Sequence, residues 1–461
     1  MTKKSTNKSN DTSATKPNLK LTNRLLGLPP EVVITGQVPH PHAVIITISF
    51  PEPEERICPH CGSLHCVIKG SLQPQTVRHI PVAGNPSFLS FKKHRYLCRD
   101  CGKSFFEQPE WLHPALRMST LLFFQISLDL TEPLSLSAIA RNRCVTAAVV
   151  GDVLGSIPMP PPGRLPETLC MDEFKGNAGT WDRARGGWDK EKFLCNIADG
   201  QAGCIIDILP SIRSEYIIPY FFQFPLSERQ KVRFFCCDMT NGYVSIARHC
   251  FPNATVCIDL FHVVKRLNTA MDEVRRRLQH ECREENPELY ALLKHASKTL
   301  LTKKETLESY PENTYLRKKE RIDAILEAFP DIRTVYNSIQ QFHSINGNNQ
   351  YALKRIDLTS WINAALSSEV PELRSAANTV KHWRACIQNS WKYDRSNGVC
   401  EGLNNKIKVL KRVSFGIHDF SSFRKRILLV CGYVHPADVS LSMRELPGRK
   451  AKEPGKEGKQ P

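Results

Sequence analysis

Hydrophobic residues follow two different spacings along the chain, and together these predict a multidomain α/β protein. Short runs of β-branched and aromatic residues, bounded by turn residues, predict strands. These runs cover residues 32–34, 43–50, 76–80, 87–96, 165–174, 192–198, 202–209, 233–239 and 255–260. Apolar residues three or four positions apart predict helices over residues 114–157 and 260–385, and again from 397 onward. The proline-rich stretch 156–163 lies between the two groups, so we expect a domain boundary there.

The segment 135–150 has the pattern of a helix-turn-helix. A first helix would turn Ile139 and Ala140 inward, a turn would follow at residues 142–144, and Thr146 would cap a second helix. In a DNA-binding protein such a second helix lies in the major groove. An ordinary helical hairpin has the same pattern, so the segment alone leaves both interpretations open.

The long helical segment 260–385 is rich in charged residues, and one face of its first helix is apolar. We expect the basic cluster at residues 275–277 to be exposed as a solvated face. Trp361 and Trp383 could stack on an unpaired base, but we expect them to fill contacts between helices.

The charge balance favours a polyanionic partner. The 461 residues include 63 Lys and Arg against 46 Asp and Glu, a net charge of +17, for which nucleic acid is the simplest partner. No apolar run approaches the roughly 20 residues of a membrane span, which excludes a membrane protein. The segment 1–20 is basic without the apolar stretch of a secretory signal, so we expect a disordered arm. The 17 cysteines, an odd number, indicate reduced thiols rather than a disulfide scaffold.

Two C-x-x-C knuckles predict a structural zinc site. They are Cys58-Pro-His-Cys61 and Cys98-Arg-Asp-Cys101, and each is followed by Gly. Four thiolates can meet at one tetrahedral Zn²⁺ and leave no open position for chemistry. The long spacer, with its predicted strands, could fold back as a ribbon. The alternative is two unrelated knuckles or a redox pair. His60, His65 and Cys66 are interpreted as neighbours of the site.

Three carboxylates interrupt or end apolar segments and are candidates for a catalytic cation site. Asp172 lies on the opposite strand face from Leu169 and Met171, Asp238 ends a predicted strand, and Glu401 opens a predicted helix. If that helix forms, Glu401, Asn404, Asn405, Lys408 and Arg412 fall on one side. Carboxylates that converge repel one another unless they share a proton or hold a cation, and their oxygens suit Mg²⁺ or Mn²⁺.

Other acids compete for these roles, and a solvated strand end is the simpler interpretation of any one of them. The competitors are Glu173, Asp207 and Asp259. Asp259 and His262 lie where a predicted strand runs into a helix, so they could contact each other or the reacting DNA. A lone histidine at a strand end is more often a hydrogen-bonded structural residue.

Motifs spread from about residue 25 to residue 433 resemble, in order, the bacterial DDE transposases of the ISL-three type. They are Ile57-Cys-Pro-His-Cys-Gly62, the segment 95–105, the helix-turn-helix, Met171-Asp-Glu-Phe174, the segment 251–265 with Ile258-Asp-Leu-Phe-His262, and Glu401-Gly-Leu-Asn-Asn-Lys-Ile-Lys408. The resemblance implies an RNase H-like mixed sheet that is interrupted by a helical insertion and preceded by a zinc ribbon and the helix-turn-helix.

The resemblance also implies roles for individual acids. The first acid of the triad falls on Asp172, the second on Asp238 and the glutamate on Glu401, and these three would hold the catalytic cations. Asp259 and His262 match an acid-x-x-His signature that would shape the site. Because Asp259 sits in an equally well-matched motif, the second acid stays open between Asp238 and Asp259.

The implied domains follow the same order along the chain. They are a disordered basic arm (1–20), a short β segment (21–57), the zinc ribbon (58–108), the DNA-binding helix-turn-helix (109–157), the RNase H-like catalytic domain in two parts (164–262 and 390–435), the helical insertion between them (263–389), and a basic tail (436–461).

The implied activity is DNA transposition in the bacterial cytoplasm, in association with the nucleoid. The enzyme would bind the terminal inverted repeats of its element and catalyse strand cleavage and strand transfer. Its cofactors would be catalytic Mg²⁺ or Mn²⁺ and structural Zn²⁺. Its partner would be double-stranded DNA, at element ends and target, and a homodimer or larger assembly is expected because two ends must meet. The alternative is a sequence-specific DNA-binding regulator with an inactive RNase H-like domain.

Overall fold

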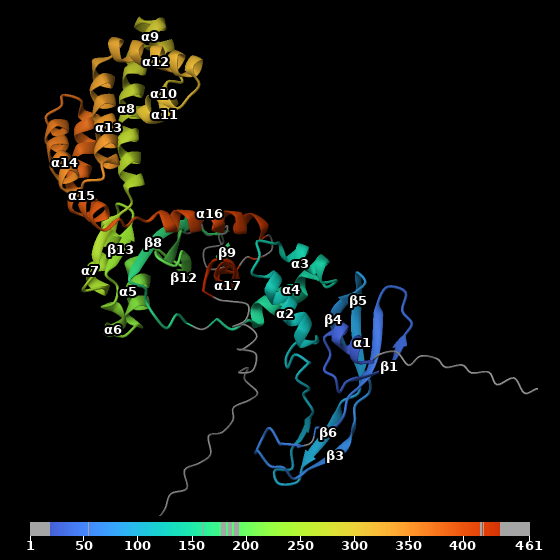
Figure 1. Ribbon diagram of the computed structural model, residues 1–461. Coiled ribbons are helices and arrows are strands. Elements are labelled where there is room, and N and C mark those ends of the chain that lie inside the picture. Colours follow the sequence, from blue (N-terminus) through green and yellow to red (C-terminus); the bar gives the residue numbers. More distant parts are fainter. Residues whose placement is uncertain are drawn as a thin grey trace, which may run out of the picture. The chain divides into compact units, whose positions relative to one another are not determined.

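The computed structural model describes most of the chain between residues 19 and 433. The described residues are 19–53, 55–159, 161–176, 181–182, 187–188, 193–414, 417 and 419–433. The predicted tail 436–461 and residues 1–18 of the predicted arm lie outside them. The chain forms two compact units, residues 1–160 with 408–461 and residues 161–407, and each is described by itself (Figure 1).

The first unit begins with α1 (Leu19–Leu26) and a four-stranded sheet in the order β1-β2-β5-β4. Its strands are β1 (Val33–Val38), β2 (Val44–Ser49), β4 (Gln75–Val82) and β5 (Asn85–Phe91). Alternate residues of β5 are buried, and Phe50, Phe91 and Trp111 pack edge to face beside them. His79 is buried between Leu26 O and Ser119 Oγ, and burial lowers the pKa of its imidazole to about 4.

A second sheet of this unit carries the zinc knuckles. Its strands are β3 (Cys66–Ser71), β6 (His94–Cys98) and β7 (Ser104–Phe106), in the order β3-β6-β7. The single strand predicted over residues 87–96 is wrong, because β5 and β6 belong to different sheets. Lys92 and Lys93 stand between them, and two adjacent lysines cannot continue the burial of alternate residues. The spacer between the knuckles therefore leaves the β3-β6-β7 sheet through β4 and β5 and then returns to it.

The first unit also contains the helices α2 (Thr120–Asp129), α3 (Leu136–Asn142), α4 (Ala147–Ser156) and α17 (Phe420–Cys431). Of these, α3 and α4 are the two helices of the predicted helix-turn-helix. Ile139 and Ala140 are buried as predicted, and the Thr146 side chain caps α4 by accepting from the N–H of Val149. Arg426 of α17 is fully buried and donates to three backbone carbonyls in the α2–α3 connection, those of Leu130, Glu132 and Leu134.

The second unit is built on a five-stranded mixed sheet in the order β12-β11-β8-β13-β14. The strands are β8 (Thr168–Lys175), β11 (Phe193–Asp199), β12 (Cys204–Leu209), β13 (Phe234–Cys237) and β14 (Thr255–Ile258), so all five predicted strands are present. The pairs β12/β11 and β11/β8 are antiparallel, whereas β8/β13 and β13/β14 are parallel. Two two-residue strands, β9 (Trp181–Asp182) and β10 (Gly187–Trp188), pair with each other.

One face of this sheet is covered by helices. Leu169, Met171 and Phe235 point to that face and share a core with α5 (Ser214–Phe222) and α7 (Asn241–Cys250), while the short α6 (Leu226–Arg229) lies between these helices in sequence. The opposite face carries the polar groups described below.

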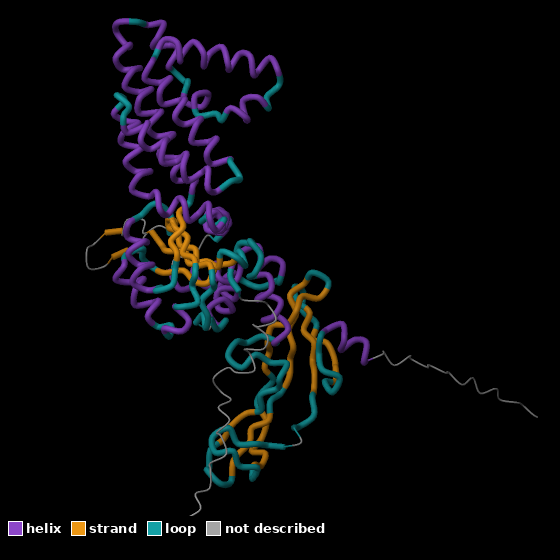
Figure 2. Tube along the Cα trace, turned by 60° about the vertical axis from the view of Figure 1, so that its left-hand side comes forward, coloured by secondary structure: helices purple, strands orange, loops and turns teal. Residues whose placement is uncertain are grey.

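Only helices and loops connect β14 to α16 (Gly398–Val413) (Figure 2). These helices are α8 (Leu260–Glu285), α9 (Pro287–Leu293), α10 (Ser297–Leu300), α11 (Lys304–Glu308), α12 (Glu312–Ala328), α13 (Pro330–Gly347), α14 (Tyr351–Leu366) and α15 (Pro371–Tyr393). Trp361 and Trp383 are buried in their core, as expected. No helix among the described residues has the length and apolar character to cross a membrane.

The expectation that residues 275–277 are exposed is wrong for two of the three arginines. The Arg275 side chain is 11% exposed and pairs with Asp272. Arg277 pairs with Asp331 of α13 at 2.9 Å and with Glu372 of α15 at 2.7 Å. Because Arg277 forms ion pairs with α13 and α15, the basic run contributes to contacts between helices rather than to a solvent-exposed face.

Candidate functional site

The same Cys-x-Asp pattern lies within β8 and at the ends of β13 and β14, which are three neighbouring strands of the second unit. The three pairs are Cys170 and Asp172, Cys236 and Asp238, and Cys257 and Asp259. Cys236 pairs in register with Cys170 on one side and with Cys257 on the other. Since side chains alternate between the faces of a sheet, the cysteines form one row and the aspartates the next row on the same face. The fold thus places Asp238 and Asp259 directly after the carboxyl ends of two parallel strands, where open α/β sheets keep their sites, next to Asp172 of β8.

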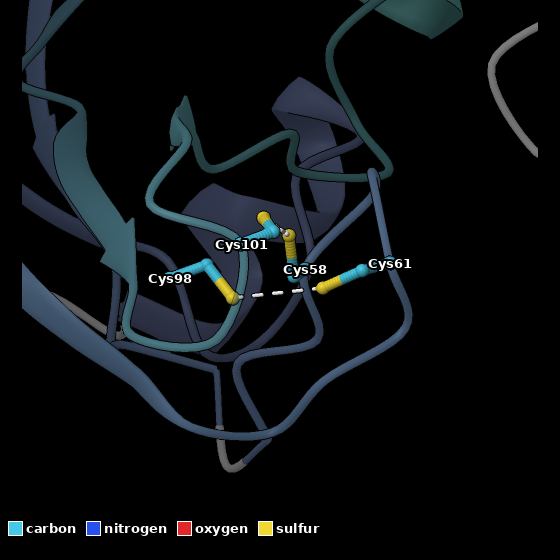
Figure 3. A group of neighbouring side chains, drawn as sticks. All are labelled: Cys58, Cys61, Cys98 and Cys101. Carbon is cyan, nitrogen blue, oxygen red and sulfur yellow. Dashed lines mark hydrogen bonds between the residues drawn. The ribbon is translucent and has the colours of Figure 1, made fainter.

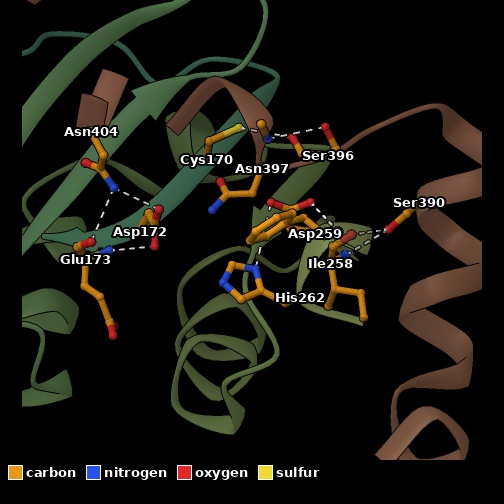
Figure 4. A network of polar contacts seen from close by, with 12 residues as sticks. Cys170, Asp172, Glu173, Ile258, Asp259, His262, Ser390, Ser396, Asn397 and Asn404 are labelled. Atoms are coloured by element: carbon orange, nitrogen blue, oxygen red, sulfur yellow. Dashed lines mark hydrogen bonds and ion pairs between the residues drawn. The ribbon is translucent and has the colours of Figure 1, made fainter. Parts of the chain in front are cut away.

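Asp172 is half-buried, and each of its oxygens has a partner. Oδ1 accepts from the N–H of Glu173 and Oδ2 from Nδ2 of Asn404, both at 2.8 Å (Figure 4). Burial, together with the negative charges of Asp238 and Glu173, raises the pKa of Asp172 to about 6. Asp172 and Asp238 are therefore close enough to repel each other when both are ionised.

Asp238 and Asp259, the two candidates for the second acid, have different surroundings. Oδ1 of Asp238 is buried, and no hydrogen-bond donor among the described residues reaches it. Oδ1 of Asp259 accepts from the N–H of Phe261 at 3.0 Å, so Asp259 caps α8. One acid is thus engaged as a helix cap, whereas the other has an oxygen in need of a partner.

His262 lies between the cap and the acids. Its Nδ1 is 3.9 Å from Oδ2 of Asp259, and its charge lowers the pKa of Asp172 and of Glu173 (Figure 4). Among the competing acids, Glu173 accepts from the Tyr243 hydroxyl at 3.3 Å, and burial raises the pKa of its carboxyl. Asp207 lies on β12, two strands away from β8.

Glu401 is exposed in the first turns of α16, one turn before Asn404. The predicted polar side of this helix is interrupted at Asn404, which is 5% exposed. Within the described part of the chain, the oxygens of Asp172, Asp238 and Glu401 do not form a group of ligands within 4.8 Å of one another. The structure therefore brings Asp172 and Asp238 together and anchors the helix of Glu401 beside them through Asn404.

The sequence did not identify the buried amide side chains of Asn404 and Asn196 as members of a hydrogen-bond chain that leads to Asp172. Asn404 donates to Asp172, and its Oδ1 accepts from Nδ2 of Asn196 at 3.2 Å. Asn196 is fully buried on β11 directly opposite Asp172. A polar residue inside the apolar run Leu194–Ala198 was the available signal. The chain Asn196, Asn404, Asp172 fixes the orientation of the acid and the position of α16.

The four knuckle cysteines of the first unit converge as predicted. Their sulfur atoms all lie within 4.8 Å of one another, with 3.7 Å between Cys58 and Cys101 and 3.6 Å between Cys61 and Cys98 (Figure 3). Zn–S bonds of about 2.3 Å in a tetrahedron put sulfur atoms about 3.8 Å apart, so the spacing fits Zn²⁺. Backbone N–H groups of Cys101 and Asp100 hold the pKa of the Cys98 thiol down, to about 6, which favours the thiolate that binds metal.

The neighbours of this cluster are not part of it. Cys66 starts β3, and its thiol donates to Ser63 O, while His65 contacts Asp100 at 3.2 Å. His60 is likewise outside the cluster, so among the described residues the group that converges consists of the four predicted cysteines alone.

Two family models match the chain. One, described as a transposase and defined for the ISL3 group, matches residues 169–427. The other, described as the zinc-finger of transposase IS204/IS1001/IS1096/IS1165, matches residues 54–101. The first covers the acid-bearing sheet and the helices that follow it, and the second covers the four cysteines.

Similar proteins include transposases of insertion sequences. The transposase for insertion sequence element IS1001 of Bordetella parapertussis is 24% identical over 384 residues, which cover 82% of this chain and 89% of that protein. The transposase for insertion sequence element IS1557 of Mycobacterium tuberculosis is 22% identical over 242 residues, 49% of this chain and 53% of that protein. A Lactococcus lactis protein named ATP-dependent protease is 27% identical over 169 residues, 34% of this chain and 52% of that protein.

Proposed function

Because this chain belongs to the ISL3 transposase family, whose model matches more than half of its residues, we propose that it cuts and joins DNA at the ends of its own insertion sequence. It would bind the terminal inverted repeats, cleave one or both strands there, and transfer the freed 3′ ends to target DNA. The reaction class is polynucleotidyl transfer and phosphodiester hydrolysis.

The single observation that carries this proposal is the pair Asp172 and Asp238. Asp172 lies on β8 and Asp238 directly follows the neighbouring parallel strand β13, and their repulsion contributes to the raised pKa of Asp172. Two ionised carboxylates side by side destabilise a fold unless a cation holds them. The sheet order and directions also support an RNase H-like fold, and the helices between β14 and α16 support a helical insertion, which would begin with α8 and end with α15.

The donor set fits a hard divalent cation. Oδ1 of Asp238 is buried without a donor among the described residues, and an oxygen with unused lone pairs is the ligand that Mg²⁺ and Mn²⁺ prefer. We propose that Asp172, Asp238 and Glu401 hold the cation, which when bound would stabilise charge that develops on the phosphate oxygens. Asp238 is our second acid rather than Asp259, because Asp259 caps α8.

The remaining residues orient this group. Asp259 fixes the first turn of α8, which carries His262, and a protonated His262 favours ionised Asp172. The bond from Asn404 to Asp172, one turn after Glu401, supports the proposal that Glu401 completes the cation site. We propose that the zinc ribbon and helix-turn-helix bind the element ends, with phosphate contacts supplying affinity and base contacts supplying discrimination. Two ends must meet, so a dimer or larger assembly on DNA is part of the proposal.

A supercoiled plasmid that carries the genomic DNA flanking the coding sequence tests the function. We expect nicked and linear products with Mg²⁺ and none without it, and we expect binding to weaken as salt rises because bound phosphates release counterions. Gel electrophoresis measures both. A protein that shifts the plasmid without nicking it under any Mg²⁺ or Mn²⁺ concentration would be a DNA-binding regulator instead.

Asn404→Ala is expected to weaken catalysis through the cation site. The change removes the donor to Asp172 Oδ2 and leaves Nδ2 of Asn196 without its acceptor. Groups that orient a metal ligand are typically worth about 10- to 100-fold in metal affinity or activity. We expect the Mg²⁺ concentration for half-maximal cleavage to rise by about that factor, as measured by a Mg²⁺ titration of plasmid nicking.

The exposed Asn363 of α14 provides a matched control for this variant. Asn363→Ala should leave the Mg²⁺ titration unchanged. If Asn404→Ala lowers the melting temperature but leaves the Mg²⁺ dependence as it is in the wild type, Asn404 only supports the fold.

A further inference from the structure

A groove of about 430 Å³ runs along α8 on the side of α10. Its near end, beside the first turn of α8, is lined by Phe261, Lys265 and Asn268, and its far end by Asp272, Glu273 and Arg276. The three residues of the near end are four and three positions apart, so they lie on one face of the helix. We call this part the Phe261 end of the groove.

The Phe261 end combines an aromatic face, a cation and an unsatisfied amide. The Phe261 ring is 52% exposed, although most phenylalanine rings are buried. Lys265 is exposed one turn further along. Oδ1 of Asn268 is buried, and no donor from the described residues satisfies it. An aromatic ring next to a cation and an amide is the set of groups that binds a nucleotide through stacking, phosphate attraction and hydrogen bonding.

The far end of the groove differs in charge. Asp272 pairs with Arg275 and with Arg276, at 2.8 and 2.7 Å, and Glu273 pairs with Arg266 at 3.4 Å. These three arginines are engaged by acids, whereas no ion pair within the described part of the chain engages Lys265, so Lys265 is the cation of the groove that remains available to a phosphate. The attractive stretch is about the length of one nucleotide, because Phe261 and Asn268 are two helical turns apart.

The Phe261 end adjoins the candidate active site. Phe261 precedes His262, and the two rings meet edge to face with centroids 5.5 Å apart. His262 in turn lies next to Asp259, with 3.9 Å between Nδ1 and Oδ2 (Figure 4). The side chains of successive helical residues point about 100° apart, so the His262 ring faces the acids while the Phe261 ring faces the groove.

We propose that the Phe261 end of the groove holds an unpaired nucleotide of the DNA strand that is being cut, with its base stacked on the Phe261 ring and its phosphate near Lys265. The inference rests on the proposed transposase function and adds a substrate subsite to it. A paired base has both faces covered by its neighbours in the duplex, so stacking on Phe261 requires a nucleotide that has left the helix. The subsite thus selects DNA that is opened next to the cleavage position.

Two probes that contain 2-aminopurine test this subsite with the full-length protein and without Mg²⁺, so that the probe is not cut. In one probe the 2-aminopurine is unpaired in a short single-stranded overhang, and in the other it is paired inside a blunt duplex of the same sequence. The wild type should quench the unpaired probe on binding and leave the fluorescence of the paired probe almost unchanged.

Phe261→Ala should bind the unpaired probe about 5- to 150-fold more weakly and lose the quenching, since stacking on an aromatic side chain is worth that much per base. Phe261→Trp should retain both, because tryptophan also offers a flat face. Phe222→Ala is the matched control, because Phe222 is 49% exposed on α5 and does not line the groove. It should behave like the wild type.

Three outcomes would overturn the inference alone. In the first, Phe261→Ala quenches and binds as the wild type does. In the second, Phe222→Ala loses as much as Phe261→Ala. In the third, the wild type binds the paired probe but neither prefers nor quenches the unpaired one, which removes the subsite while the proposed function stands. Failure of the wild type to bind either probe would remove the DNA-binding function and the subsite together.

Discussion

Asp172→Asn is expected to abolish DNA cleavage while DNA binding and the fold remain intact. The asparagine keeps the size of the side chain and one oxygen that can accept from Glu173 N–H, but it removes a negative charge from the cation site. Losing the cation's stabilisation of the reacting phosphate is worth several kcal/mol, so cleavage should fall by about 10³-fold or more. Plasmid nicking measures this loss, and a gel shift with the same DNA measures binding.

The change places a new amide Nδ2 against Nδ2 of Asn404, but rotation of the Asn404 and Asn196 amides by 180° restores a donor and an acceptor at each contact, since Oδ1 of Asn196 has no donor among the described residues. The change also removes the repulsion between Asp172 and Asp238. The melting temperature of the variant without Mg²⁺ is therefore expected to be equal to or above that of the wild type. Asp323→Asn, at an exposed position of α12, changes the net charge equally and should cleave normally. Full cleavage by Asp172→Asn in Mg²⁺ would refute the assignment of the first acid.

Asp238→Asn and Asp259→Asn in the same assay decide between the two candidates for the second acid. Asparagine is as good a helix cap as aspartate, so Asp259→Asn should keep the start of α8. Asp238→Asn removes the charge of the buried oxygen that lacks a donor, and we expect it to resemble Asp172→Asn. The reverse result would move the second acid to Asp259.

The local elements of this protein could be predicted from sequence because local rules decide them. Ser135 and Thr146 are strong caps, and the turn between them contains Cys144 with a φ of 50°, so α3 and α4 begin where the capping residues predict. The five strands of the acid-bearing sheet are apolar runs bounded by turn residues, which again is a local signal. The two C-x-x-C knuckles are also local patterns, and they were enough to predict that the four cysteines lie together.

Long-range pairing could not be predicted in this way. The repeated Cys-x-Asp pattern is visible in the sequence, but only the register of β8, β13 and β14 puts the three acids in one row. The bond from Asn404 to Asp172 joins residues 232 positions apart, and nothing local to either one requires it. Local sequence also does not predict the ion pairs of Arg277 with α13 and α15. Because of these pairs, the arginine lies in contacts between helices and not in an exposed cluster.

The two proposed metal sites differ in what holds their residues. Asp172 is held by the sheet and by the buried amide of Asn404, so its position does not depend on a cation. The cysteine site has little else to hold it, since the core beside it consists of Cys58, Cys66 and Cys98 with Cys101 and Phe105 against them. We therefore expect removal of the divalent cation to stop cleavage without unfolding the protein, and removal of zinc to unfold the sheet next to the cysteines.

Removal of zinc is accordingly expected to unfold the β3-β6-β7 sheet. Structural zinc in small domains contributes on the order of 10 kcal/mol of apparent binding energy, which is folding energy where the apo site is not preformed. Cys98→Ser should have the same effect, because Cys98 is fully buried and takes part in the tetrahedron of sulfur atoms. Metal analysis should show loss of bound zinc, and limited proteolysis should cut between residues 55 and 106.

Cys66→Ser is the matched control for the zinc prediction. Cys66 is also a buried cysteine of this small core, and it pairs with Cys98 across β3 and β6, but it is outside the group of four. Its thiol donates to Ser63 O, and a serine hydroxyl can do the same. The control should keep zinc and resist proteolysis, whereas omission of Mg²⁺ should stop cleavage without exposing any site to protease. If zinc-free protein kept an intact β3-β6-β7 sheet, the four cysteines would not be a folding site, and their convergence would need another explanation.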